Sequence, residues 1–272
     1  MEPWRKLRPF PKAVPRLAFL DFDGTLSLLR AGWMPIMRRQ MFEALRPLGT
    51  EESDALIMVQ IESWIQENNG KPTWRQMERL EAEVSRRGGA SIGWPKYLAD
   101  FSSRLMDQVI PRKQSLRDGT EIPSNLCVEG AHSLLDNLQR HGLELHLVSG
   151  TERHHVVEEA ELLGLTKYFG DRIYGPTGHN DGFSKQKVLE TLVPDATLRN
   201  TVLAIGDGPV EISLVSGCGG LAVGVARSEN GQGMDAATAK LLDECGAHAL
   251  VAGFQSAEAF TDWLLVHRGE RP

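Results

Sequence analysis

The chain has 272 residues, 41% of them hydrophobic, which is enough to bury a substantial core and excludes a protein that is disordered throughout. Its 30 Lys and Arg residues face 36 Asp and Glu residues, a formal net charge of −6, so no global positive field attracts nucleic acid or an anionic membrane. The three cysteines lack the spacing of a disulfide framework or a zinc site, which favours a reducing, cytoplasmic location.

Residues 1–15 are basic and rich in proline, and we expect them to form an extended arm that packs through Trp4 or Phe10. This segment has no apolar stretch of the kind found in secretion signals. Apolar runs elsewhere are far shorter than the ~20 residues that a membrane-spanning helix requires. The sequence therefore predicts a soluble protein that does not act on a membrane.

Residues 17–20 form the first clear element, an apolar Leu-Ala-Phe-Leu run that ends abruptly in the acidic segment Asp21-Phe-Asp-Gly-Thr25. A short run without polar alternation is typical of a strand buried on both faces of a parallel sheet. The sequence thus predicts a buried strand that presents acidic side chains at its carboxyl end.

Long amphipathic segments follow, with turn-forming residues at 47–49, 69–70 and 88–89. Apolar residues recur in them at helical spacing, so they predict helices joined by turns. The predicted helices cover 34–47, 51–68, 73–87 and 95–108.

Beyond residue 124, predicted helices alternate with predicted strands, the pattern of a parallel sheet with crossover helices. The strand at 17–20 needs partners, and parallel ones occur only in this half. We therefore expect an α/β core built from 16–27 and 124–272, interrupted by a helical insertion at 28–123. The predicted helices are 129–141, 152–163, 184–192 and 209–216, and the strands are 143–148, 171–174, 201–205 and 221–225.

Polar side chains follow several of these strands, where ligands bind in open parallel sheets. They are Asp21 and Asp23, Ser149, the Lys185/Lys187 pair, and Asp207 with Glu211. Carboxylates that converge in one cleft repel each other, which a divalent cation relieves, and hard oxygen ligands suit Mg²⁺. A lysine and the backbone amides of Gly24 and Gly150 would add the charge balance for holding a phosphate group.

Four short motifs here resemble those of the haloacid dehalogenase-like (HAD) superfamily, in the family's order. They are DFDGT at 21–25, Ser149 after an apolar strand, Lys185, and GDGPVE at 206–211. The resemblance covers 16–27 and 128–250. It implies a Rossmann-like core with a parallel sheet, and the position of the insertion resembles an all-helical C1-type cap.

The resemblance also implies a role for each motif residue. Asp21 would be the nucleophile that forms an aspartyl-phosphate, and Asp23 the acid and base that protonates the leaving group and then activates water. Ser149, Gly24 and Gly150 would bind the phosphoryl oxygens. Mg²⁺ would be bound by Asp21, Asp23, Asp207 and Glu211.

Two positions leave alternatives open. The register Lys185-Gln-Lys-Val-Leu189 resembles that of phosphoserine-phosphatase-like members and favours Lys185 as the catalytic lysine, but Lys187 competes for the role. At position 211 the family usually has Asp, and the longer Glu211 would ligate the metal either directly or through water.

The insertion would close over the substrate and read its leaving group. Lys71, Thr73 and Gln76 in the turn between two cap helices are candidate substrate contacts, although helix capping and a solvated turn explain them nearly as well. Arg30 and Trp33 are further candidates for the wall of the same cleft.

The sequence favours a Mg²⁺-dependent phosphomonoesterase acting on a small phosphorylated metabolite, with sugar phosphates as the leading class. A phosphomutase of the same superfamily is the alternative, and a non-catalytic HAD-like domain that binds phosphate or a partner is the alternative from another class. No nucleic-acid or membrane partner is expected, and a homodimer is the expectation from the frequency of symmetric oligomers.

Overall fold

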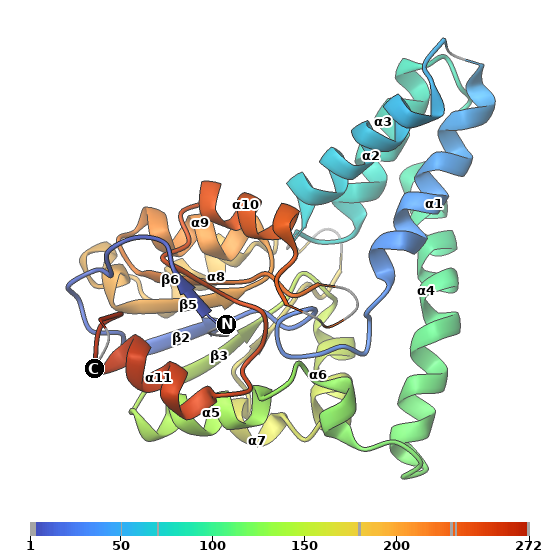
Figure 1. Ribbon diagram of the computed structural model, residues 1–272. Coiled ribbons are helices and arrows are strands. Elements are labelled where there is room, and N and C mark those ends of the chain that lie inside the picture. Colours follow the sequence, from blue (N-terminus) through green and yellow to red (C-terminus); the bar gives the residue numbers. More distant parts are fainter. Residues whose placement is uncertain are drawn as a thin grey trace.

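The computed structural model describes residues 4–49, 51–69, 71–178, 181–228, 231 and 233–270, and shows an α/β core from which a group of long helices projects (Figure 1). The core contains one seven-stranded sheet with the order β1-β7-β6-β5-β2-β3-β4. All strand pairs are parallel except that of β1 with β7. The strands are β1 (Trp4–Lys6), β2 (Leu17–Leu20), β3 (Glu144–Val148), β4 (Ile173–Tyr174), β5 (Val202–Gly206), β6 (Leu221–Val225) and β7 (Ala249–Val251).

Strand β2 lies near the middle of the sheet, and each of its four residues is buried. It is covered on both faces, which explains the unbroken apolar run in its sequence. Its last residue, Leu20, pairs with Leu147 of β3 and Ile205 of β5. These three strands therefore end together, and the residues that follow them meet at one edge of the sheet.

Helices pack on both faces of the sheet, and each face has its own apolar core. Residues of α5, α6 and α11 join one core, and residues of α8, α9 and α10 join the other. The core helices are α5 (Ala131–Arg140), α6 (Arg153–Leu162), α7 (Thr166–Phe169), α8 (Lys185–Leu192), α9 (Pro209–Gly217), α10 (Ala236–Glu244) and α11 (Ala257–Leu265). Short 3₁₀ helices occupy Arg46–Leu48, Pro123–Leu126 and Ala196–Thr201.

Four helices between β2 and α5 form the projecting group: α1 (Trp33–Leu45), α2 (Asp54–Asn68), α3 (Trp74–Arg86) and α4 (Trp94–Arg117). They share a third apolar core, which includes Met41, Ile61, Leu80 and Phe101. Arg112 of α4 donates hydrogen bonds of 2.8 Å to the carbonyls of Leu29 and Ala31, which fixes this helix against the segment that leaves the core.

The α4 helix is longer than the sequence pattern predicted, because it continues nine residues past 108 to Arg117 and includes Pro111. Pro111 is exposed, so its ring lies on the solvent side of the helix. The N-terminal arm packs as expected, with the Trp4 ring 5.5 Å from that of Phe260 and the Phe10 ring 5.1 Å from that of Trp263. Within the described residues, no helix combines the length and apolar character needed to span a lipid bilayer.

Candidate active site

Three acidic residues and a lysine meet where β2 and β5 end. Asp21 follows β2, Asp207 follows β5, Glu211 lies in the first turn of α9, and Lys185 is the first residue of α8. The Lys185 Nζ lies 2.6 Å from Asp21 Oδ1 and 2.7 Å from Glu211 Oε2, and this lysine is 2% exposed. One cation thus bridges two buried carboxylates that are far apart in sequence.

The electrostatics of this cluster follow from its burial. Desolvation opposes the charge of Lys185, but the carboxylates of Asp21 and Glu211 outweigh it and raise the pKa of the lysine. Burial raises the pKa of Asp207 well above its usual range, and the nearby charges of Asp21 and Glu211 add to that effect. Three carboxylates and one lysine leave an excess of negative charge in a place with little water.

Of the two candidate lysines, Lys185 contacts Asp21 and Lys187 does not. Ser184 caps α8 by accepting a hydrogen bond from the Lys187 amide, and this start of the helix points the Lys185 side chain into the acidic cluster. Lys187 is exposed, and its Nζ donates to the carbonyl of Gly182 at 2.7 Å.

Glu211 has two contacts that together explain its position. Its Oε1 accepts a hydrogen bond of 3.0 Å from the Gly208 amide at the start of α9, and its Oε2 accepts from Lys185. Glu211 is fully buried, and burial raises its pKa while the charge of Lys185 opposes that rise. The extra methylene of Glu relative to Asp lets one carboxylate reach both the loop and the lysine.

Gly24 allows the first acidic loop to approach the loop after β5. Its φ is +79°, and a Cβ at this position would lie 2.3 Å from Asp207 Oδ2. The neighbouring Thr25 is buried, and its Oγ1 accepts a hydrogen bond of 3.0 Å from the Asp207 amide. Glycine at 24 and threonine at 25 therefore set the distance between Asp21 and Asp207.

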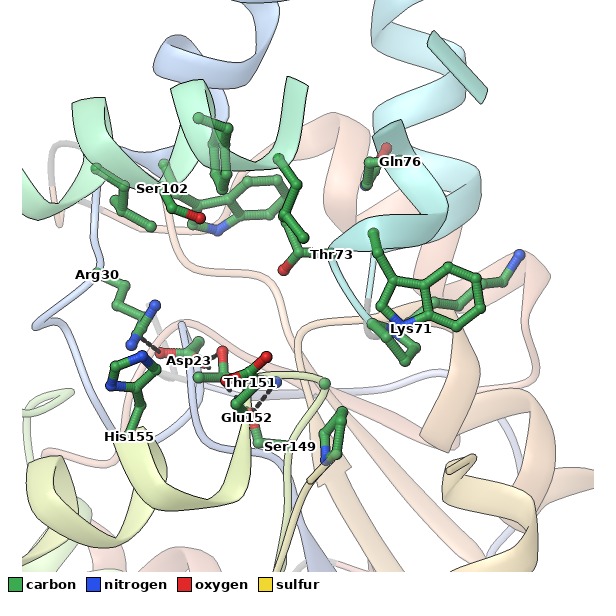
Figure 2. A pocket seen from close by; sticks show the side chains of 18 of the residues that line it. Asp23, Arg30, Lys71, Thr73, Gln76, Ser102, Ser149, Thr151, Glu152 and His155 are labelled. Atoms are coloured by element: carbon green, nitrogen blue, oxygen red, sulfur yellow. Dashed lines mark hydrogen bonds and ion pairs between the residues drawn. The ribbon is translucent and has the colours of Figure 1, made fainter. Parts of the chain in front are cut away.

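Residues that follow the neighbouring strand, β3, bind the Asp23 carboxylate by hydrogen bonds. Its Oδ2 accepts hydrogen bonds from Thr151 Oγ1 at 2.8 Å and from Ser149 Oγ at 3.3 Å (Figure 2). The Ser149 hydroxyl accepts from the Thr151 amide at 3.0 Å, which fixes the turn after β3. Burial raises the pKa of Asp23, against the opposing effect of Arg30. A carboxyl group whose pKa is raised in this way is suited to proton donation near neutral pH.

Arg30 and Glu159 form a buried pair beside Asp23. Arg30 donates two hydrogen bonds to the Glu159 carboxylate, of 3.0 and 2.7 Å, and its Nε lies 3.8 Å from Asp23 Oδ1. Glu159 is fully buried on α6. Glu159 binds the Nε–Nη2 edge of the guanidinium with both carboxylate oxygens, so its negative charge partly offsets the positive charge that Arg30 presents to Asp23.

The acidic cluster fits a hard divalent cation. Carboxylate oxygens of Asp21, Asp207 and Glu211 lie within 4.8 Å of one another. All of these donors are oxygens, the ligands that Mg²⁺ prefers, and a cation there would offset the excess negative charge. The donor set is therefore compatible with Mg²⁺.

A pocket of about 260 Å³ lies above these residues. Its lower end is lined by Asp21, Asp23, Ser149, Gly150 and Thr151, together with Arg30, Glu152 and His155. Helices of the projecting group cover the opposite end, and Figure 2 shows Ser102, Thr73 and Gln76 on their side of the pocket. Ligand access to Asp21 and Asp23 thus lies between the α/β core and the projecting helices.

The three candidate substrate contacts predicted around the turn between α2 and α3 differ in their exposure and hydrogen bonds. Lys71, Thr73 and Gln76 all line the pocket. Lys71 is exposed, and its Nζ donates to Asn68 Oδ1 at 3.2 Å. Gln76 is buried, and its amide nitrogen donates to the Ile65 carbonyl at 3.2 Å, a contact that ties α3 to α2. Trp33 lines the pocket as well.

A family model for haloacid dehalogenase-like hydrolases matches residues 15–216. This chain belongs to that family. The match covers β2, the projecting helices, and the strands β3 and β5, which end just before Ser149 and Asp207. A search of the curated proteins gives no match.

Solved structures of other haloacid dehalogenase-like proteins share the fold. A conserved haloacid dehalogenase-like protein from Agrobacterium tumefaciens is 20% identical, covers 92% of this chain and 99% of its own, and has a TM-score of 0.58. A predicted phosphoglycolate phosphatase from Haemophilus somnus is 16% identical, with coverage of 91% and 98% and a TM-score of 0.56. A putative β-phosphoglucomutase from Thermotoga maritima is 18% identical, with coverage of 92% and 100% and a TM-score of 0.52.

The sequence analysis missed three residues that contact the site of this haloacid dehalogenase-like hydrolase. Thr151 donates a hydrogen bond to Asp23, and its place three residues past β3 could have suggested that contact. Glu159 lies 129 residues from Arg30, so no local pattern reveals their pairing. Asn69 donates to the Asp207 carbonyl at 3.5 Å, which links the turn between α2 and α3 to the loop after β5.

Proposed function

We propose that this haloacid dehalogenase-like hydrolase is a Mg²⁺-dependent phosphomonoesterase that acts on a small phosphorylated compound. The observation that carries the proposal is the arrangement of two carboxylates at the floor of one pocket. Asp21 is held by Lys185, and Asp23, two residues further on, has a raised pKa. One group is thus suited to attack phosphorus, and the other to donate a proton.

Asp21, Asp207 and Glu211 would hold the metal with their carboxylates, and Asp23 would contribute its backbone carbonyl. When bound, Mg²⁺ neutralises charge on the phosphoryl oxygens and on the attacking carboxylate. Lys185 adds a second positive charge, since its Nζ lies 2.6 Å from Asp21 Oδ1. Ser149 and the Gly150 amide line the pocket and would donate hydrogen bonds to the phosphoryl oxygens. The Gly24 amide, expected to do the same, instead donates to the Ser27 carbonyl at 2.9 Å.

In the first step the free carboxylate oxygen of Asp21 attacks phosphorus, and the bond between phosphorus and the ester oxygen breaks. Asp23, protonated, gives its proton to that oxygen, so that an alcohol leaves rather than an alkoxide. In the second step Asp23, now ionised, takes a proton from water as the water oxygen attacks the aspartyl-phosphate. The bond between phosphorus and Asp21 breaks, and inorganic phosphate leaves.

Residues 28–123 would act as a cap for this chemistry. Closure of the cap over the pocket would exclude bulk water while the leaving group departs. Asn69 supports this role because its side chain contacts the backbone of Asp207 from the cap side.

The test is release of inorganic phosphate from a panel of phosphomonoesters, with Mg²⁺ or with EDTA. We expect metal-dependent release that Asp21→Asn lowers by at least about 10³-fold, because the nucleophile is lost. Asp171→Asn is the matched control. Asp171 is an exposed residue of the α/β domain, so this variant should retain activity. Unchanged turnover of Asp21→Asn would contradict the proposal, and transfer of the phosphoryl group to a second hydroxyl instead of water would favour the mutase.

A further inference from the structure

The cap side of the pocket is apolar along one face of α4. Five residues of this helix line the pocket, at positions i, i+3, i+4, i+7 and i+8, which lie on one helical face. They are Leu98, Phe101, Ser102, Leu105 and Met106. From α1, Trp33 and Met37 line the pocket at positions i and i+4. We call these seven residues the ceiling.

The ceiling is continuous with the core of the cap. Met37, Phe101 and Leu105 are buried members of that core, and Trp33, Leu98 and Met106 are half-buried and pack against it. The only hydroxyl of the ceiling is that of Ser102. The pocket side of α1 and α4 is thus an apolar wall, and a ligand that fills the pocket would contact it.

Charged groups are absent from this part of the pocket. Among the residues that the structure describes, none of the ionisable ones that line the pocket lies on α1 or α4; they are Asp21, Asp23, Arg30, Lys71, Glu152 and His155. Apart from Ser102, the polar cap residues that line the pocket lie between the end of α2 and the first turn of α3. There Asn68, Asn69 and Gln76 donate hydrogen bonds to backbone carbonyls, and the buried Gln76 Oε1 has no partner among the described residues. The pocket therefore has a charged lower end, an apolar wall formed by α1 and α4, and a polar wall formed by residues between α2 and the first turn of α3.

This division restricts the leaving group. A polyhydroxylated sugar held against the ceiling would lose hydrogen bonds to water, and the ceiling itself offers only the Ser102 hydroxyl and the Trp33 indole N–H in exchange, which is unfavourable. Met and aromatic side chains instead give close contact with apolar or aromatic groups. The pocket of about 260 Å³ is also at the small end of ligand sites, typically ~300–1,000 Å³, so the group is compact rather than a long chain.

Resting on the phosphatase function proposed above, we infer that the substrate is a phosphate monoester of a compact, apolar, ring-sized alcohol. The phosphoryl group lies over Asp21, and the ring lies against Trp33, Phe101 and the other ceiling residues. This inference replaces the sugar phosphate that the sequence analysis favoured.

A matched pair of substrates tests the inference. Cyclohexylmethyl phosphate and glucose 6-phosphate both carry a six-membered ring on a CH₂–O–P group, but only the second bears hydroxyls. We expect kcat/KM for cyclohexylmethyl phosphate to be higher by at least about tenfold. Equal values, or a preference for glucose 6-phosphate, would overturn the inference.

A substitution in the ceiling should change this preference. Leu98→Asn places an amide on the pocket face and is expected to lower the kcat/KM ratio of the two substrates at least about fivefold, chiefly through KM. The control is Ile110→Asn on the same helix, because Ile110 is 59% exposed and does not line the pocket. The same ratio in both variants would count against the ceiling as the contact surface.

A binding experiment separates the inference from the proposed reaction. Isothermal titration of benzylphosphonate and methylphosphonate, which are not hydrolysed, should give at least about tenfold tighter binding for the first, with a negative heat-capacity change. Equal affinities would overturn the inference even if the protein is active. Acetyl phosphate is too small to reach the ceiling. Its hydrolysis therefore tests the phosphatase proposal independently of the inference about the leaving group.

Discussion

The two ends of the pocket are built in opposite ways. At the lower end, single residues at the ends of β2, β3 and β5 hold one another through short polar contacts, such as the 2.6 Å contact of Lys185 with Asp21. At the upper end, α1 and α4 present apolar side chains that belong to a packed helical core. The first arrangement fixes charges in place, and the second offers a surface without directional contacts.

This difference indicates which changes should affect which property. A substitution at the lower end alters buried charges, so it should affect every substrate and the stability of the fold. A substitution at the ceiling or at the exposed rim should affect mainly the affinity for particular leaving groups. Three further substitutions test this division, in order of decreasing effect.

The largest effect is expected from Lys185→Met, which leaves the Asp21 and Glu211 carboxylates buried without their cation. We expect the free energy of unfolding to fall by about 3–5 kcal/mol in EDTA, as for other buried pairs that lose one partner, and Mg²⁺ to restore part of it. Urea denaturation with EDTA or with Mg²⁺ measures both quantities.

Lys187→Met is the matched control for this variant, since Lys187 is exposed and its Nζ donates to the Gly182 carbonyl. It should change the free energy of unfolding by less than about 0.5 kcal/mol. Equal destabilisation of the two variants would contradict the assignment of Lys185 to the buried cluster.

The sequence was sufficient for those parts of the fold whose signals are local. The strand at 17–20 is where it was predicted, because a strand buried on both faces has an unbroken apolar sequence. The β1 strand was missed because it is a three-residue edge strand that includes exposed Arg5 and Lys6. The short β7 strand and the helices α10 and α11 were not predicted either. The predicted end of α4 was wrong because Pro111 is usually a helix breaker.

The candidate site shows the same limit. The motifs place Asp21, Ser149 and Asp207 at strand ends, and the register of the parallel strands brings them together. Which lysine faces them depends on where α8 begins, because residues two apart lie on nearly opposite sides of a helix. The apolar ceiling is equally hidden in the sequence, since a helix face that covers a pocket has the same pattern as one that covers a core.

An intermediate effect is expected from Glu159→Gln, which removes the charge that balances Arg30 beside Asp23. Burial raises the pKa of Asp23, and the Glu159 charge adds to that rise, so the variant should lower this pKa. Since the first step needs Asp23 protonated, activity is lost as pH rises through its pKa. The alkaline limb of the pH profile of kcat should therefore move to lower pH.

Glu158→Gln is the control for this prediction, because the neighbouring Glu158 pairs with Lys113 and Arg117 and does not line the pocket. Its pH profile should match that of the wild type. A shift of the alkaline limb to higher pH in Glu159→Gln would be incompatible with Asp23 as the proton donor.

The smallest effect is expected from Lys71→Ala. Lys71 lines the pocket but is exposed, and its Nζ donates a hydrogen bond to Asn68 Oδ1 in the same turn. An exposed charge is screened by water and contributes at most about 1 kcal/mol, so KM should rise less than about fivefold with kcat unchanged. Steady-state kinetics of Lys71→Ala beside Lys96→Ala, an exposed α4 lysine outside the pocket lining, measures the difference. A fall in kcat of tenfold or more would mean that Lys71 enters the reaction itself, and the division between a charged lower end and an apolar ceiling would then no longer describe how this pocket works.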